Sequence, residues 1–140
     1  MKLVKNKKEY WESIREVRTH PNNIGGFIEQ GEITTEQQKE YMSKHNDHYY
    51  VCLAEYENTF MGFIGVIDND IRLAVSPGLQ GYGTGTFMIN EIRKIFPEAT
   101  AKVRVDNFAC NKAFRKARFE ITGTIKIGEE QFNVYKNGNV

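Results

Sequence analysis

Residues 70–86 place an apolar strand before a loop with glycines at positions 81, 83 and 85, and an amphipathic helix follows the loop. Glycine lets another molecule approach the backbone closely, and the N–H groups that open a helix point at whatever lies in front of them. Such a site suits an anionic group such as a pyrophosphate. The chain is therefore expected to fold as strand, glycine-rich loop and helix here, with the loop as a ligand site.

Three kinds of glycine-rich loop compete for this stretch, besides an ordinary turn between a strand and a helix. A Walker-type loop ends in Gly-Lys-Ser/Thr, but here Thr86 follows Gly85 and no lysine is present. A dinucleotide-binding loop has Gly-x-Gly-x-x-Gly directly after its strand and an acidic residue about 20 positions on. Asp106 partly meets that pattern, but position 86 is not glycine and residues 76–80 separate the strand from the glycines. The loop thus disfavours a dinucleotide-dependent oxidoreductase, which stays an alternative.

The third kind fits best. Residues 80–85, Gln-Gly-Tyr-Gly-Thr-Gly, resemble the Gln/Arg-x-x-Gly-x-Gly/Ala signature of the GNAT superfamily of acyl-CoA-dependent N-acetyltransferases. Residues 73–77, Leu-Ala-Val-Ser-Pro, are similar to the strand that leads into that signature. The resemblance covers roughly residues 50–135.

A second motif of the same family, Asn-x-x-Ser-x-x-x-Tyr-x-x-x-Gly-Phe, is matched in spacing by Asn107, Cys110, Phe114 and Phe119. Two positions depart from it, because Phe114 replaces the usual tyrosine and Arg118 the usual glycine. Phenylalanine has no exchangeable proton, so the general acid of the family is missing, and Tyr82 or Tyr135 or water would have to replace it.

Apolar periodicity and turn residues predict the order of the elements. Helix starts and stops are visible, as where Thr34 is followed by Gln37 in a capping pattern and where Pro97 ends the helix after the glycines. Residues 22–31 are expected to form a loop. Strands are expected at 3–5, 49–56, 60–67, 71–75, 101–105, 121–127 and 131–135, and helices at 9–19, 34–45, between the glycines and Pro97, and at 107–119.

This order predicts a mixed α/β (α+β) fold with a mainly antiparallel sheet of six or seven strands flanked by about four helices. The same order is that of the GNAT fold, and the resemblance implies that the two central strands splay apart.

Length, charge and cysteine count predict the number of domains and argue against several kinds of partner. A length of 140 residues predicts one domain over residues 1–140, and a formal net charge of +1 gives no electrostatic case for nucleic acid or an anionic membrane. The basic N-terminus lacks the apolar segment of a secretory signal. Cys52 and Cys110 show neither metal-ligand spacing nor a disulfide framework. We therefore expect no metal, no membrane partner and a cytoplasmic location.

The resemblance implies acetyl-CoA as the cofactor. Its pantetheine arm would pair with the backbone of Leu73, Ala74 and Val75, and the Val75 amide would face the thioester oxygen. The pyrophosphate would lie on the amides of residues 81–86, Asn107 or Asn111 would bond to the arm, and Phe114 would pack against it. The full set of expected cofactor-binding residues is Leu73, Ala74, Val75, Gln80, Gly81, Tyr82, Gly83, Thr84, Gly85, Thr86, Asn107, Asn111 and Phe114.

The expected reaction is transfer of an acetyl group to the primary amine of a small molecule, including an amino sugar or a nucleotide-linked amino sugar, in a ternary complex. Asp70 and Glu55, with Asp68, are the candidate general bases, and each could equally be a turn or solvent-facing acid. Glu29 and Glu32 could bind a cationic substrate. The alternatives are acetylation of a protein or peptide and a non-catalytic acyl-CoA-binding module. The protein would act as a monomer or a homodimer.

Overall fold

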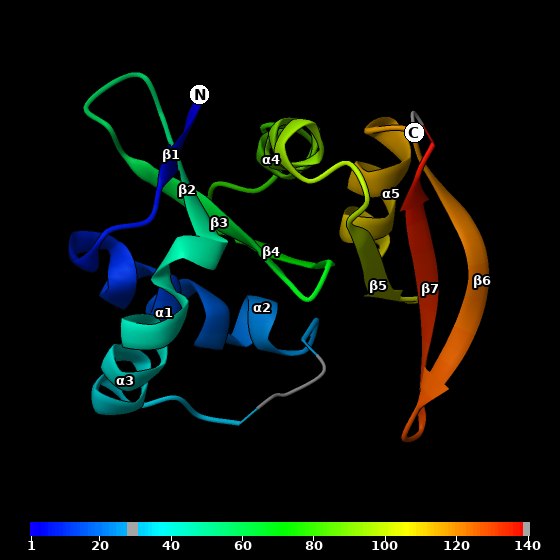
Figure 1. The fold of residues 1–140 in the computed structure, drawn as a ribbon, viewed down its shortest axis with the longest axis horizontal. Helices are drawn as coiled ribbons and strands as arrows, with labels where there is room; N and C mark the ends of the chain where they lie inside the picture. The colour runs from blue at the N-terminus through cyan, green and yellow to red at the C-terminus, as the bar shows by residue number, and fades with distance from the viewer. Residues whose placement is uncertain (28–30, 139–140) are drawn as a thin grey trace.

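A seven-stranded sheet runs through the centre of the molecule, and helices pack on both sides of it (Figure 1). The computed structural model describes residues 1–27 and 31–138. The strands are β1 (Lys2–Lys5), β2 (Tyr49–Leu53), β3 (Phe60–Ile67), β4 (Asp70–Val75), β5 (Thr100–Arg104), β6 (Phe119–Ile127) and β7 (Glu130–Asn137). The helices are α1 (Trp11–Thr19), α2 (Pro21–Ile24), α3 (Thr35–His45), α4 (Thr84–Ile95) and α5 (Phe108–Lys116), with single 3₁₀ turns η1 (Lys8–Tyr10) and η2 (Asn46–His48).

The strands lie in the order β1-β2-β3-β4-β5-β7-β6. Every neighbouring pair is antiparallel except β4 and β5, which are parallel and joined by α4. A parallel pair needs a crossover of this kind. The predicted mixed, mainly antiparallel sheet of up to seven strands is confirmed.

The two central strands splay apart, as expected. β3 and β4 pair over six positions, whereas β4 and β5 pair only at Asp70 and Thr100, where both strands begin. The Thr100 N–H donates to the carbonyl oxygen of Asn69 at 2.7 Å at the same point. From there toward Val75 and Arg104 the two strands separate, so one edge of β4 has no strand beside it.

One core fills each face of the sheet. Beneath α4 and α5 the buried side chains include Met88, Ile92, Val103 and Phe114, and Leu73 and Val75 of β4 pack against them. On the opposite face α1 and α3 bury Ile14, Met42, Val51, Phe63 and Ala74. In Figure 1, α1, α2 and α3 accordingly lie on one side of β1–β4 and α4 on the other.

The structure corrects the start of the loop predicted at residues 22–31, because Pro21–Ile24 form the short helix α2, and residues 28–30 of that range lie outside the described residues. A proline just after a helix is typical of a helix stop, but proline also favours the first position of a helix, which is where Pro21 lies. His20 caps that helix by accepting from the Asn22 N–H at 3.1 Å. Five α-helices are therefore described where about four were expected.

Two predicted boundaries are also wrong. The helix expected at 107–119 ends at Lys116, and Phe119 begins β6. Arg118, which stands at the family's glycine position, has a positive φ of 65° and reverses the chain between them. The strand expected at 49–56 ends at Leu53, because Glu57 and Asn58 take positive φ values in the turn to β3.

Candidate active site

The glycine-rich loop joins the end of β4 to the start of α4. Gly81 and Gly83 have φ values of 91° and 79°, in the region that favours glycine. At both positions no protein atom lies within 4 Å of the place a Cβ would occupy, so the backbone is approachable from outside. Gly83 is the cap residue of α4 and supplies no side-chain hydrogen bond to its first turn. The first turn thus presents N–H groups to an anion in front of it.

The unpaired edge of β4 presents peptide groups whose direction follows from the hairpin before it. The turn between β3 and β4 has two residues, Asp68 and Asn69, with φ values of 52° and 63°. In such a hairpin the residues flanking the turn exchange hydrogen bonds, and every second residue along the strand does the same. The peptide groups of Leu73 and Val75 therefore point away from β3, into the space where β5 has separated.

Asn23 of α2 reaches that edge. Its Nδ2 donates to the carbonyl oxygen of Val75 at 3.0 Å and to that of Val17 at 2.9 Å. Its Oδ1 accepts from Nε2 of Gln80 at 3.4 Å. One side chain thus links α1, the end of β4 and the glycine-rich loop. The sequence offered no signal for this role, since Asn after proline is also typical of turns.

Arg104 ends β5 on the other side of the opening and was also missed by sequence reasoning. Its Nη1 donates to the carbonyl oxygen of Gly25 at 2.7 Å, and its Nη2 pairs with Glu130 at 2.7 Å. Gly26 lies so close to Asn107 that an added Cβ would be 3.1 Å from Nδ2 of that residue. Residues 23–26 therefore span the opening from the end of β4 to the end of β5.

Asn107 caps α5, because its Oδ1 accepts from the N–H of Cys110 at 3.2 Å. Its Nδ2 lies against the segment that spans the opening, as just described. The cap is thus the role that the structure records for Asn107, and the hydrogen bond to a cofactor arm stays a prediction.

Asn111 has no capacity left for a ligand, which corrects its expected role. It is 2% exposed, and its Nδ2 donates to the carbonyl oxygens of Arg104 at 2.9 Å and Asn107 at 2.8 Å. Its Oδ1 accepts from the Tyr135 hydroxyl at 2.6 Å and from Asn133 at 3.0 Å. A side-chain amide has two donors and two acceptor sites, and all four are used. Asn111 instead fastens α5 to β5 and β7.

Phe114 lies in the core and not on a surface that a cofactor arm could line. Its ring is 0% exposed and stacks on Tyr135 at 5.3 Å between centroids, with Phe119 edge-on at 5.2 Å. Tyr135 is equally buried, and that burial raises the pKa of its hydroxyl. Neither residue is positioned to exchange a proton with substrate. Tyr82, the other proposed donor, is 69% exposed on the loop.

Of the candidate bases, Asp70 lies at the far end of β4, whereas Glu55 lies at the same end of the sheet as Val75 but is turned to solvent. Asp70 begins the strand at its closed end, about 16 Å along the strand from Val75, and pairs with Lys102 at 3.2 Å and Arg72 at 3.7 Å. Glu55 follows β2 in the turn to β3, is 82% exposed and pairs with the N-terminal amine at 3.6 Å. Glu32 is exposed, and Glu29 lies outside the described residues. The structure gives Asp70, Glu55 and Glu32 no contact with the Val75 peptide.

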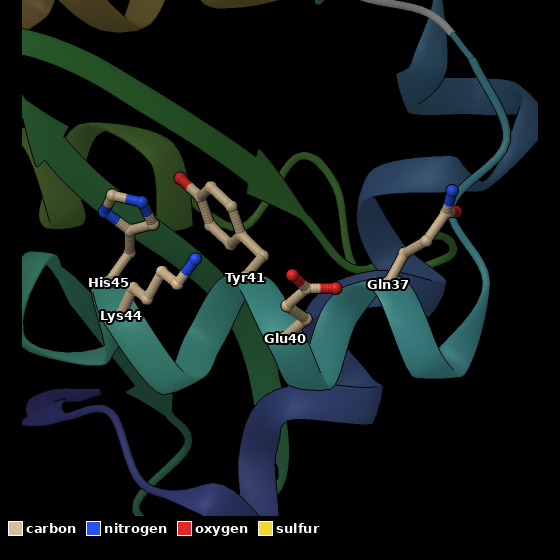
Figure 2. A pocket seen from close by; sticks show the side chains of 5 residues that line it. All are labelled: Gln37, Glu40, Tyr41, Lys44 and His45. Atoms are coloured by element: carbon tan, nitrogen blue, oxygen red, sulfur yellow. The ribbon is translucent and has the colours of Figure 1, made fainter.

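A hollow of about 280 Å³ lies along α3 and is lined by Gln37, Glu40, Tyr41, Lys44 and His45. Figure 2 shows these five side chains projecting from α3, with Tyr41 and His45 directed toward the strands. None of the five belongs to β4 or to the glycine-rich loop. The hollow is therefore separate from the site at the open end of β4.

Residues 1–27 and 31–138 contain no cluster of three or more His, Cys, Asp or Glu side chains that could hold a metal ion. None of the helices described there is long and apolar enough to cross a membrane.

Comparison with known families identifies the class of protein that this site defines. A model of the acetyltransferase (GNAT) family matches residues 10–119. The chain belongs to that family and is an acetyl-CoA-dependent acetyltransferase. A search of curated proteins finds no match.

Solved structures share the fold at low sequence identity. A GNAT-family acetyltransferase from Bacillus anthracis is 17% identical, with a TM-score of 0.77 over 95% of this chain and 90% of that one. Spermidine N-acetyltransferase from Vibrio cholerae, in complex with CoA and spermine, is 15% identical, with a TM-score of 0.80 over 96% and 91%. Ribosomal-protein-alanine N-acetyltransferase from Brucella melitensis is 16% identical, with a TM-score of 0.78 over 96% and 98%.

The residues at the open end of β4 fit acetyl-CoA. The uncapped first turn of α4 and the approachable backbone at Gly81 and Gly83 suit a diphosphate. The peptide groups of Leu73 and Val75 that face away from β3 suit the amides of a pantetheine arm, which can bond to them as an added strand would. The Val75 carbonyl oxygen accepts from Asn23 and keeps a second lone pair for such a bond.

Proposed function

We propose that this chain, as a single domain over residues 1–140, acetylates the primary amine of a small molecule in a ternary complex with acetyl-CoA. The observation that carries the proposal is the open edge of β4, which ends beside the uncapped start of α4. A backbone that suits an anion, at the start of α4, thus lies next to a strand edge that suits the pantetheine arm. The bound acetyl-CoA supplies the acetyl group as a thioester.

The backbone performs most of the proposed work. The N–H groups of residues 81–86 hold the diphosphate, and the peptide groups of Leu73 and Val75 hold the arm. The Val75 N–H donates to the oxygen on which negative charge develops. A donor fixed in place for such an oxygen contributes about 3–4 kcal/mol to lowering the barrier. Asn23 and Arg104 keep residues 23–26 over this point, where the acceptor enters.

The acceptor amine reacts in its neutral form under this proposal. Asp68 and Asp70 lie at the closed end of β4, and Glu55 is exposed and paired with the N-terminal amine, so no carboxylate is assigned as the base. Water carries away the amine proton and returns one to the departing thiolate, since Phe114 has none to give. A general acid or base typically contributes about 10²–10⁴-fold, so we expect modest turnover.

The choice between a small molecule and a protein as the acceptor rests on the charge of this chain. The neighbours include one enzyme named for spermidine and one named for a ribosomal protein's alanine, so the fold occurs in enzymes named for a small amine and for a protein residue. We favour a small molecule because a net charge of +1 comes with no long acidic run for a basic peptide.

Release of free thiol from acetyl-CoA, measured with a panel of amines, tests the proposal. We expect acetyl-CoA and CoA, but not NAD, to raise the melting temperature, and at least one small amine to accelerate thiol release over the rate without acceptor. Binding of acetyl-CoA with no acceleration by any amine or peptide would favour a non-catalytic binding module. Acceleration by peptides alone would favour protein acetylation.

A further inference from the structure

The guanidinium of Arg104 is held in place by two residues of β7. Arg104 lies directly opposite Phe132, and Glu130 precedes Phe132 by two positions, so the three side chains share one face of the sheet. The guanidinium lies 6.0 Å from the centre of the buried Phe132 ring, and its Nη2 pairs with Oε2 of Glu130 at 2.7 Å. Arg104 is only 14% exposed. The strand pairing thus places the guanidinium over an aromatic ring, and Glu130 fixes its direction.

The other terminal nitrogen of Arg104 reaches the segment that spans the opening, residues 23–26, which we call the acceptor strap. This nitrogen, Nη1, donates to the carbonyl oxygen of Gly25 at 2.7 Å. A guanidinium is rigid and planar, so a carboxylate bonded to one terminal nitrogen restricts the direction in which the other can donate. Glu130 therefore acts on the acceptor strap through Arg104, from the first residue of β7.

The acceptor strap is attached to both of the strands that separate. Asn23 bonds to the carbonyl oxygen of Val75 at the end of β4 at 3.0 Å, and Gly25 bonds to Arg104 at the end of β5. No atom lies within 4 Å of the place a Cβ of Gly25 would occupy, so the strap has open space on that side. The bond from Arg104 thus sets how closely the strap approaches β5.

We propose that Glu130 is a positioning residue for the acceptor: through Arg104 it holds the acceptor strap where the amine meets the Val75 peptide. The inference rests on the proposed function, since it places the acceptor beneath the strap. Without Glu130 the guanidinium can turn toward water or toward Asp106, whose Oδ1 lies 3.9 Å from Nε. The strap then leaves β5 more often, which weakens acceptor binding. The glycine-rich loop and the edge of β4 are unchanged, so cofactor binding is not affected.

A matched pair of glutamates tests the role of the carboxylate. Glu129 and Glu130 are adjacent and exposed in the same hairpin, and within the described residues Glu130 has an ion pair and Glu129 has none. We expect Glu130→Ala to raise KM for the amine about two- to fivefold, as for a partly exposed ion pair, with kcat and KM for acetyl-CoA nearly unchanged. Glu130→Gln keeps an oxygen that can accept and should recover part of the loss, and Glu129→Ala should change nothing.

A double-mutant cycle tests whether Glu130 acts through Arg104. Arg104→Gln should raise KM for the amine about tenfold or more, because the carbonyl oxygen of Gly25 loses a charged donor. Adding Glu130→Ala to that variant should then have no further effect. Arg104→Lys keeps the charge but not the planar fork, so it should be intermediate.

Amide hydrogen exchange of the unliganded protein follows the acceptor strap without catalysis. The N–H of Gly26 donates to the carbonyl oxygen of Asn23 at 3.0 Å, and that of Phe27 to the carbonyl oxygen of Ile24 at 3.2 Å. A strap released from β5 opens more often, so these two amides should exchange about threefold faster or more in Glu130→Ala. Their exchange should be unchanged in Glu129→Ala.

The outcomes separate the two proposals. Equal KM values for the amine in Glu130→Ala and Glu129→Ala would overturn the positioning role, as would a rise in KM without faster exchange. The same rise from Glu130→Ala with and without Arg104 would overturn it too. If Arg104→Gln does not fold, the two glutamate variants decide alone, and their melting temperatures are recorded. If no amine releases thiol, the proposed function fails, and the hydrogen exchange of the two glutamate variants then shows whether Glu130 holds the strap: faster exchange in Glu130→Ala alone supports this, and equal exchange overturns it.

Discussion

The side-chain amide of Asn23 donates to the carbonyl oxygen of Val75 at 3.0 Å, joining a short helix near the N-terminus to the last residue of the central strand. The two residues are 52 positions apart in the sequence. Because the same amide also bonds to Val17 and accepts from Gln80, it holds the acceptor side of the site against the cofactor side.

Replacement of Asn23 by alanine should damage the acceptor site more than the fold. We expect KM for the amine to rise about tenfold or more and KM for acetyl-CoA to change less, because residues 23–26 lose their attachment to β4. The free energy of unfolding should fall by about 1–3 kcal/mol, which is the usual cost of leaving buried hydrogen-bond partners unsatisfied. Steady-state kinetics and urea denaturation measure the two effects. Asn22→Ala is the control, since Asn22 is exposed and its side chain makes none of these bonds. Equal effects of the two variants would remove the role assigned to Asn23.

Gly83→Val should weaken binding of CoA severely. A β-branched residue at a φ of 79° is strained by roughly 1–2 kcal/mol, and the loop is expected to leave the conformation that aims its N–H groups outward. Gly128→Val is a matched control, because Gly128 has a φ of 61° and equally open surroundings in the turn between β6 and β7. Both variants should lose similar stability. Titration calorimetry with CoA should show a loss only for Gly83→Val, and unchanged affinity there would contradict the placement of the diphosphate.

Tyr135→Phe should reduce the stability of the fold without reducing the rate of acetyl transfer. The hydroxyl donates to Asn111 inside the core, so its loss leaves a buried acceptor with one partner fewer and costs about 1–2 kcal/mol. Because Tyr135 is fully buried, we expect kcat to stay within about twofold at a temperature where the variant is folded. Tyr82→Phe, at the exposed loop position, should affect stability by less than about 0.5 kcal/mol. A fall in kcat of a hundredfold in either variant would identify the missing proton donor.

The pH dependence of kcat/KM should follow the acceptor. With no carboxylate assigned as base, the rate rises with pH as the amine itself loses its proton and levels off above the amine pKa. Two acceptors whose amine pKa values differ by about 2 should give profiles displaced by the same amount. Profiles that instead coincide near pH 6 would indicate an enzymatic base that the present assignment lacks.

The protein's own thiols should react too slowly to contribute to the signal of a thiol-release assay. Burial raises the pKa of Cys52 to about 11 and that of Cys110 to about 12. A thiol is nucleophilic as the thiolate, and a raised pKa keeps it neutral at all lower pH values, so at pH 8 only about one molecule in a thousand is reactive at Cys52. Ellman's reagent should therefore label the native protein far more slowly than protein unfolded in urea. Rapid labelling of the native form would show that one of the two sites opens.

The fold was largely predictable because its signals are local. Thr34 and Gln37 form the expected capping box, and the turns at Asn58 and Asn69 separate the strands as expected. The failures occurred where one residue type serves two purposes. Pro21 can end one helix or begin another, and Arg118 shows nothing in its side chain that predicts a left-handed backbone.

The site was predictable only where it is made of backbone. Glycines at 81 and 83 reveal a loop conformation directly, but no spacing tells whether a helix side chain such as Asn111 faces a ligand or the core. The carboxylate of Asp70 was expected near the reaction because it lies on the right strand, yet it is at the wrong end. Asn23 and Arg104 act through contacts with segments far away in the sequence, which a single sequence does not specify.

The two-residue turn at Asp68 and Asn69 begins the alternation along β4 between residues whose peptide groups bond to β3 and residues whose peptide groups face the open edge. A slip of β4 by one residue against β3 would exchange the two sets, so the N–H of Val75 would bond to β3 and the proposed donor would be lost, although no residue near the substrate had changed. The pairing register that begins at the far tip of this hairpin is thus a requirement for the proposed activity, as are the residues of the site itself.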